Sequence, residues 1–147
     1  MSSLYLDTSV LVAAFSVETA QSVAQTLLQD EKWRSIFVSD WTLTEFVCAF
    51  HAKVLRGETP QDTFTAIQAT LKRLVAQEQL TVLAVLREDY LTVQKKAPAL
   101  TEMIRGADAL HLAIAARMKT THFASFDKAQ QRVAKRWLKK THILGLD

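Results

Sequence analysis

Residues 4–15 read LYLDTSVLVAAF, and this stretch decides the fold that we expect. The apolar run at 4–6 predicts a short strand that ends at Asp7. Thr8 or Ser9 can cap a helix over residues 10–15, because hydroxyl oxygens accept hydrogen bonds from the free N–H groups of a helix start. A strand that leads directly into a helix is typical of α/β domains.

The same alternation continues along the chain. Apolar and β-branched runs predict further strands at 36–38, 81–85, 122–125 and around Ile143. Helical spacing, caps and breakers predict helices over 19–30, 41–56, 60–78, 87–97, 106–118 and 127–140. No repeat or linker divides the chain, so we expect one α/β domain over residues 1–147, with a central parallel β-sheet flanked by helices.

Composition sets the broad class of protein. Hydrophobic residues make up 49% of the chain, with only 3 glycines and 2 prolines, which is enough for a core without covalent staples. The single cysteine, Cys48, excludes an internal disulfide and fits a reducing compartment. Residues 1–15 lack a basic flank and carry Asp7, and no apolar run is long enough to span a membrane, so we expect a cytoplasmic location. The net charge of +3 favours an anionic partner only weakly.

Two aspartates follow predicted strands directly. Asp7 ends the first strand, and Asp127 comes just after the strand at 122–125. In open parallel sheets the carboxyl ends of the strands form the ligand crevice, so these two side chains can converge. Each could equally be a simple helix cap. Ser125 places a hydroxyl two residues before Asp127.

Glu45 lies on a helix with two apolar sides. One stripe is formed by Leu43, Phe46, Val47, Phe50 and Val54. Glu45 points the other way, among Trp41, Cys48, Ala49 and Ala52. A carboxylate among apolar groups is unfavourable unless it is paired or metal-bound. The alternative is a partly exposed glutamate without a role.

Asp108 stands in the first turn of a helix that is apolar nearly all round, which predicts a buried helix. Stabilisation of the helix dipole is the simplest reason for an acid there. His111 lies one turn further on the same face, where it could orient Asp108 or touch a substrate. It could also be an ordinary hydrogen-bonded core histidine.

Several carboxylates at one sheet edge repel one another, and a hard divalent cation relieves that repulsion. Mg²⁺ takes oxygen ligands, usually one or two carboxylates with waters and substrate phosphates. The chain has neither the Cys/His spacing of a zinc site nor a glycine-rich phosphate loop. The four acids therefore predict a magnesium-dependent site.

The last predicted helix carries a cationic stripe that could contact a nucleic-acid backbone. Arg136 lies at the edge of this stripe. Further basic candidates elsewhere in the chain are Arg105, Arg117 and Lys119. The alternative is that the stripe is simply a solvated helix face. The stripe consists of Lys128, Arg132, Lys135 and Lys139.

Four segments together resemble the PIN-domain nucleases, and in particular the VapC-like toxins of type II toxin–antitoxin systems. They are YLDTS at 5–9, the segment 39–46 that ends in TEF, RGADALHLA at 105–113 and SFD at 125–127. Their order and spacing cover nearly the whole chain, and the segment around Asp108 is the most specific. Two departures are Ser125, where the family often has threonine or asparagine, and Asp40-Trp41, where a proline is common.

The resemblance implies that Asp7, Glu45, Asp108 and Asp127 hold one or two Mg²⁺ or Mn²⁺ ions, with Thr8, Ser9 and Ser125 as supports. It implies endonucleolytic hydrolysis of RNA, a homodimer, and a small antitoxin protein as partner. We expect the antitoxin near the helix at 41–56 and the helices around it, because that helix is apolar on two sides.

Several alternatives stay open at this point. The chain could be a non-catalytic RNA-binding or scaffold module, a PIN-type nuclease of general RNA processing, or a nuclease directed at DNA. A phosphatase with an aspartate nucleophile would need a lysine in the crevice, and no lysine is an evident candidate. The RNA substrate, the number of metal ions, and the choice between Glu45 and Asp108 as the base are not determined.

Overall fold

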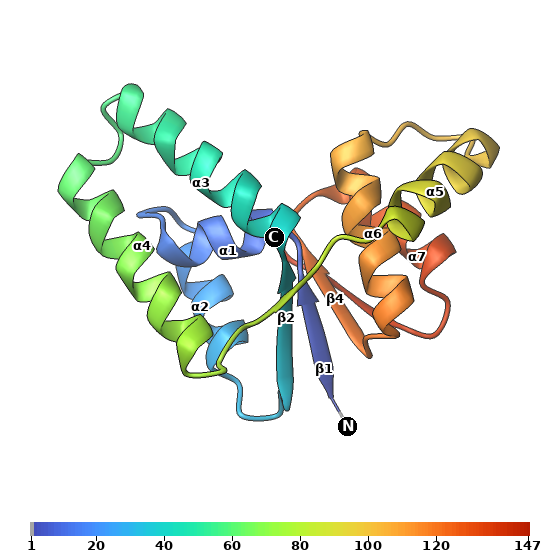
Figure 1. The fold of residues 1–147 in the computed structure, drawn as a ribbon, viewed down its shortest axis with the longest axis horizontal. Helices are drawn as coiled ribbons and strands as arrows, with labels where there is room; N and C mark the ends of the chain where they lie inside the picture. The colour runs from blue at the N-terminus through green and yellow to red at the C-terminus, as the bar shows by residue number, and fades with distance from the viewer. Residues whose placement is uncertain (1) are drawn as a thin grey trace.

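The computed structural model describes residues 2–147, which form a central sheet between two groups of helices (Figure 1). The strands are β1 (Ser3–Leu6), β2 (Ser35–Ser39), β3 (Thr81–Leu83), β4 (His122–Ser125) and β5 (His142–Gly145). The helices are α1 (Thr8–Phe15), α2 (Gln21–Gln29), α3 (Asp40–Leu55), α4 (Gln61–Ala76), α5 (Arg87–Lys96), α6 (Gly106–Met118) and α7 (Lys128–Trp137), with a short 3₁₀ helix η1 (Ala97–Ala99).

All five strands are parallel, in the order β3-β2-β1-β4-β5. The chain first builds the sheet outward from β1 to β3 and then returns to the other side of β1 with β4. This reversal lies between β1 and β4, and a ligand crevice forms at such a point beyond the carboxyl ends of the strands. The expected α/β fold with a central parallel sheet is confirmed.

Helices α1 to α4 cover one face of the sheet, and α5 to α7 cover the other (Figure 1). The strand β1 supplies both cores, because successive side chains of a strand point to opposite faces. Leu4 and Leu6 pack with the aromatic residues of α3 and α4, whereas Tyr5 packs with α6, α7 and Phe123. All residues of β1 from Leu4 to Leu6 are fully buried.

Several boundaries differ from those predicted by one to three residues. Asp7, rather than Thr8 or Ser9, is the N-cap of α1, because its carboxylate already accepts the Ser9 N–H. Pro60 is the cap of α4 and not its first helical residue. The strand predicted at 81–85 ends at Leu83, and the helix predicted at 87–97 passes into η1 at Ala97.

The prediction that the last helix reaches residue 140 is wrong, because α7 ends at Trp137. Leu138 leaves the helical backbone angles (φ −110°, ψ 61°) and is buried in the core, so the chain turns toward β5. Lys139 therefore lies beyond the helix that was expected to carry it. Within residues 2–147, no helix has both the length and the apolar character that crossing a membrane requires.

Candidate functional site

The carboxyl-terminal edge of the sheet brings together the four acids that the sequence singled out. Asp7 follows β1, and Asp127 caps α7 just after β4. Asp108 stands in the first turn of α6, and Glu45 comes from α3 on the other side of the sheet. Their exposure is graded: 7% of the Asp7 side chain is exposed, against 15% for Asp108, 26% for Glu45 and 31% for Asp127. Asp7 is thus the floor of the site.

Asp7 is held rigidly by its neighbours. Its Oδ2 accepts from the backbone N–H of Ser9 at 3.1 Å and from the Ser9 hydroxyl at 2.6 Å, and the Ser125 hydroxyl lies 3.4 Å away. The backbone N–H of Phe126 donates to the Ser9 hydroxyl oxygen at 3.2 Å. Ser9 and Ser125 therefore support Asp7 and tie the ends of β1 and β4 together.

Gln130 is a residue of the site that the sequence reasoning missed. It is fully buried on α7, and its Nε2 donates to Asp7 Oδ1 at 3.2 Å and to the Asp108 carbonyl at 3.0 Å. Its Oε1 accepts from the Ser125 hydroxyl at 2.6 Å. Its helical spacing from Val133, Ala134 and Trp137 puts Gln130 on the inner face of α7. This spacing could have identified Gln130 as an inward-facing residue from the sequence.

Asp108 and Asp127 are bridged by an arginine. Arg105 Nε donates to Asp108 Oδ2 at 3.0 Å, and its Nη2 lies 3.6 Å from Asp127 Oδ2. The other Asp127 oxygen caps α7 by accepting from the Gln130 backbone N–H at 2.8 Å. The Arg105 side chain is 79% exposed, so this guanidinium is a solvent-accessible cation at the rim. Beside it lies a depression of about 230 Å³ that both aspartates line.

Of the roles open to His111, the structure favours a buried, hydrogen-bonded histidine, and its imidazole faces Glu45 rather than Asp108. His111 Nε2 lies 2.5 Å from Glu45 Oε1, and the Thr8 hydroxyl donates to the same oxygen at 2.7 Å. An ionised carboxylate can only accept, so Nε2 is the donor. Asp7 Oδ1 is 3.6 Å from the same nitrogen. The fully buried His111 thus stands between Glu45 and Asp7.

Tyr5 continues this network into the core, and it too was missed. Its hydroxyl lies 2.8 Å from His111 Nδ1 and donates to the Ser39 hydroxyl at 3.0 Å. Ser39 also caps α3, the helix that carries Glu45. The same polar chain therefore fixes both the imidazole and the start of the α3 helix.

The environments of two carboxyls push their pKa values in opposite directions. Burial raises the pKa of Asp108, and the nearby charges of Asp7 and Asp127 add to this rise, while Arg105 opposes it. Burial also acts to raise the pKa of Glu45, but hydrogen bonds from His111 and Thr8 outweigh it, so that this pKa lies below its ordinary value. Glu45 therefore stays charged more readily than Asp108 does.

The donor set fits a hard divalent cation in its chemistry. Asp108 lies close enough to Asp7 and Asp127 for their negative charges to act on it, and the positive charge of Arg105 opposes them. Among residues 2–147, no three acidic, histidine or cysteine side chains converge into a complete metal site. Mg²⁺ does not need one, since it commonly takes one or two carboxylates and completes its shell with water and substrate phosphate.

The basic residues named in the sequence analysis differ in their exposure and in their ion pairs. Lys128, Arg132 and Lys135 lie exposed along α7, and Lys128 pairs with Asp147 near the C-terminus. Arg117 is not free to meet a ligand, because it makes a two-pronged ion pair with the buried Asp89. Lys119 is the C-cap of α6 and has left-handed backbone angles. It lies at the opposite end of this helix from Asp108.

Comparisons with known proteins agree with this architecture. The profile of the PIN domain family matches residues 4–136. A search of curated proteins finds no match. Among solved structures, VapC20 of Mycobacterium tuberculosis, a toxin that cleaves the sarcin-ricin loop, superposes with a TM-score of 0.69 at 15% identity over 88% of this chain and 94% of that one.

Two further structures are similar. FitAcB of Neisseria gonorrhoeae gives a TM-score of 0.65 at 14% identity, covering 97% of this chain and 96% of that one. VapBC2 of Rickettsia felis, bound to a DNA fragment from its promoter, gives 0.65 at 13% identity and covers 99% of both chains. At these identities the likeness establishes a shared fold.

Proposed function

Because this chain belongs to the PIN domain family, we propose that it is a metal-dependent endoribonuclease that hydrolyses RNA phosphodiester bonds at the edge formed by Asp7, Glu45, Asp108 and Asp127. One observation carries the proposal: four distant segments place carboxylates around one rim, with the deepest of them locked by five donors or neighbours. Such rigid positioning of acids is typical of a site that binds charge.

We assign Asp7, Asp108, Glu45 and Asp127 as the residues that would hold one or two Mg²⁺ or Mn²⁺ ions. A divalent cation bound there supplies charge neutralisation on the phosphate and lowers the pKa of water. Ser9, Ser125 and Gln130 hold Asp7 in place, and Thr8 and His111 hold Glu45. Either Glu45 or Asp108 would accept the proton of the attacking water.

The chain's own cations complete the attraction for RNA. Arg105 stands at the rim next to Asp108 and Asp127, where a guanidinium can turn toward a phosphate oxygen. The exposed stripe of Lys128, Arg132 and Lys135 on α7 leads away from Asp127 and can follow the backbone. The cytoplasmic location expected from the sequence remains a prediction.

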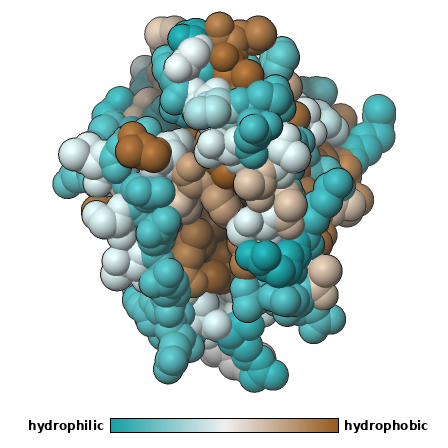
Figure 2. Space-filling view, turned by 90° about the vertical axis from the view of Figure 1, so that its left-hand side faces the viewer, coloured by the Kyte–Doolittle hydropathy of each residue, from teal (hydrophilic) through white to brown (hydrophobic). Residues whose placement is uncertain are grey.

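We further propose that the chain is the toxin of a toxin–antitoxin pair. Figure 2 shows the side formed by α4, where polar side chains frame an apolar hollow. A groove of about 360 Å³ lies between α4 and the helices α1 and α2, lined by Phe15, Leu28, Ile36 and Leu74 among others. An amphipathic antitoxin helix would fit it. In this proposal the antitoxin docks beside α4, one of the helices around α3.

A homodimer is proposed on the opposite face. Leu86, the N-cap of α5, and Tyr90 and Leu91 on that helix are 39%, 48% and 46% exposed, so three large apolar side chains gather on one surface. An apolar depression of about 280 Å³ next to them is lined by Trp41, Val93 and Leu110. A second copy of the chain would cover this surface.

Removal of divalent cations tests the central claim. We expect the purified chain to cleave a mixed-sequence RNA in Mg²⁺ or Mn²⁺, to stop when EDTA is added, and to recover when the metal is restored in excess, because anionic carboxylates alone repel the phosphate. Gel analysis of a labelled RNA measures this. Cleavage that continues at full rate in chelator would reject the metal-dependent mechanism, and binding without any turnover would support the non-catalytic alternative.

His111 is expected to act as a positioning residue. Replacing it with Leu removes the donor from Glu45 and should lower the cleavage rate about 10- to 100-fold, the usual effect of losing an outer partner of a metal-ligating group. The half-saturating Mg²⁺ concentration should rise, which a purely structural role would not cause. An unchanged metal dependence with an intact rate would exclude this role.

A further inference from the structure

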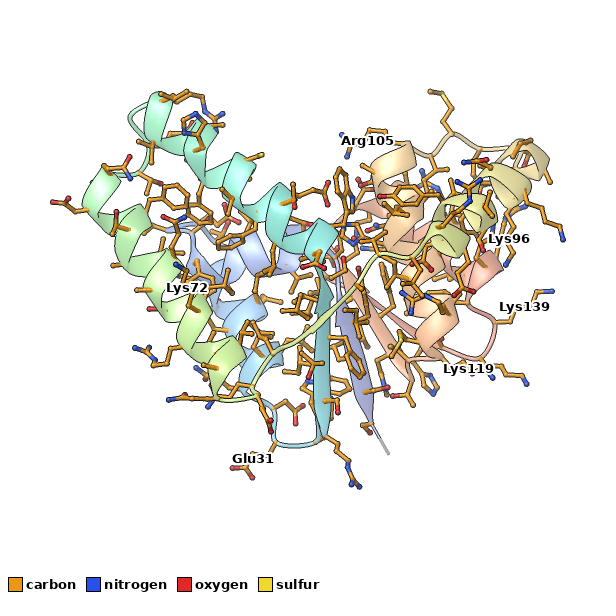
Figure 3. All side chains as sticks on the ribbon, in the orientation of Figure 1. Glu31, Lys72, Lys96, Arg105, Lys119 and Lys139 are labelled. Carbon is orange, nitrogen blue, oxygen red and sulfur yellow. The ribbon has the colours of Figure 1, made fainter. Side chains whose placement is uncertain are left out.

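A broad basic groove lies away from the acidic edge, where the carboxyl-terminal ends of α5, α6 and α7 meet. It measures about 880 Å³. Figure 3 labels three of its lysines, Lys96, Lys119 and Lys139, which lie on the same side of the molecule as these helices. We name it the distal basic groove, and its six cations are Lys95, Lys96, Lys119, Arg136, Lys139 and Lys140.

The positive charge of this groove exceeds the partial negative charge of the helix carboxyl ends beside it. All six cations are exposed, and no acidic residue lines the groove. Within residues 2–147, Arg136 is the one cation of the six with an ion pair, to Glu102 at 3.3 Å. Three helix carboxyl ends together carry roughly 1.5 negative charges, so most of the lysine charge is uncompensated. Clustered like charges of this kind are stabilised by an anionic partner.

The floor of the groove points to a single-stranded nucleic acid. Leu100, Ala116 and Leu138 line it together with the half-buried ring of Trp137. Lys96 Nζ lies over the face of that ring, 5.8 Å from its centre, so a cation and an aromatic surface are presented together. Aromatic rings that stack bases, combined with a basic track for the backbone, are typical of sites for single strands.

The groove is continuous with the acidic edge in two ways. Helix α7 runs from its cap Asp127 in the site to Trp137 in the groove, and its ten residues span about 15 Å. The segment 100–105 borders both depressions, since Leu100 lines the groove while Met103 and Arg105 line the hollow beside Asp108. At ~3.4 Å per phosphate of a stacked strand, this distance corresponds to about four or five nucleotides.

We propose that the distal basic groove binds the RNA substrate as a single strand about five nucleotides from the scissile bond, with Trp137 stacking a base. This inference rests on the proposed function and narrows its substrate class to RNAs with an unpaired stretch that spans both sites. The protein then recognises its RNA by the length of the unpaired stretch, in addition to any base contacts at the acidic edge.

The test is RNA binding without cleavage. Fluorescence anisotropy in EDTA measures the affinity of a labelled 20-nucleotide single-stranded RNA for the full chain and for the double variant Lys96→Ala/Lys119→Ala. We expect the Kd to rise roughly tenfold, and the slope of log K against log salt to become shallower by about 1.4, since each lost phosphate contact contributes ~0.7 for a single strand. The native chain should also bind a trinucleotide far more weakly than the longer RNA.

The matched control is Lys72→Ala/Arg73→Ala on α4, which removes the same charge from the opposite side of the molecule (Figure 3). It should change the Kd less than twofold. Equal losses in the two variants, no loss in the groove variant, or a loss for duplex DNA or an acidic peptide but not for RNA would overturn the proposal. Because no turnover is needed, a failure of metal-dependent cleavage in a separate assay would reject the nuclease function and leave the binding result interpretable.

Discussion

Replacing Asp7 with Asn is expected to lower the rate of RNA cleavage by at least about 10²–10³-fold, the scale on which a single electrostatic contact to the reacting centre acts. The change removes one negative charge from the floor of the site. Asn is as good an N-cap as Asp, so α1 should still start at Thr8. Initial rates with saturating Mg²⁺ measure the effect, and thermal unfolding confirms that the variant is folded.

Asp62→Asn supplies the control for this experiment, because Asp62 is an exposed acid in the first turn of α4, remote from the acidic edge. Its rate should equal that of the native chain. In cells, the native chain expressed alone should arrest growth, and Asp7→Asn should not, if the toxin role is correct. Full activity of purified, folded Asp7→Asn would remove Asp7 from the site.

The second large effect concerns stability. Asp89 is 1% exposed on α5, and Arg117 of α6 donates to both of its oxygens, at 2.8 and 3.0 Å. Arg117→Ala leaves a buried carboxylate that still accepts a hydrogen bond from the Leu86 backbone N–H at 2.8 Å but has lost its cation. We expect the free energy of unfolding to fall by about 3–5 kcal/mol, because an uncompensated buried charge is strongly unfavourable. Urea denaturation measures it.

Two further variants test whether the loss of stability comes from the ion pair itself. The double variant Asp89→Asn/Arg117→Met removes both charges and should recover a large part of the lost stability. Arg73→Ala, an exposed arginine on α4, should shift the free energy of unfolding by less than about 0.5 kcal/mol. A loss below ~1 kcal/mol for Arg117→Ala would contradict the prediction that Asp89 depends on this cation. Because α6 also carries Asp108 and His111, the pair helps to position the site.

Much of the fold could be predicted from short-range signals. The run LYLD at 4–7 contains a buried strand and the acid that ends it. The helix predicted at 41–56 ends at Leu55, just before Gly57, whose φ of 73° does not continue a helix. The end of α7 could not be predicted in this way. The helical pattern continues past Trp137, but the burial of Leu138 and the return of the chain to β5 override it.

The sequence by itself determined the order of strands and helices and the positions of the acids at their ends, because caps, breakers and periodicity act within a few residues. Only the tertiary structure decided which groups meet. It paired His111 with Glu45, 66 positions away, instead of with Asp108, and brought Gln130 to Asp7 across 123 positions. It also engaged Arg117 with Asp89 and gathered basic residues from α5, from α7 and from the segments that follow α6 and α7 into one groove. Such contacts depend on how helices pack across a parallel sheet, and no local pattern encodes that packing.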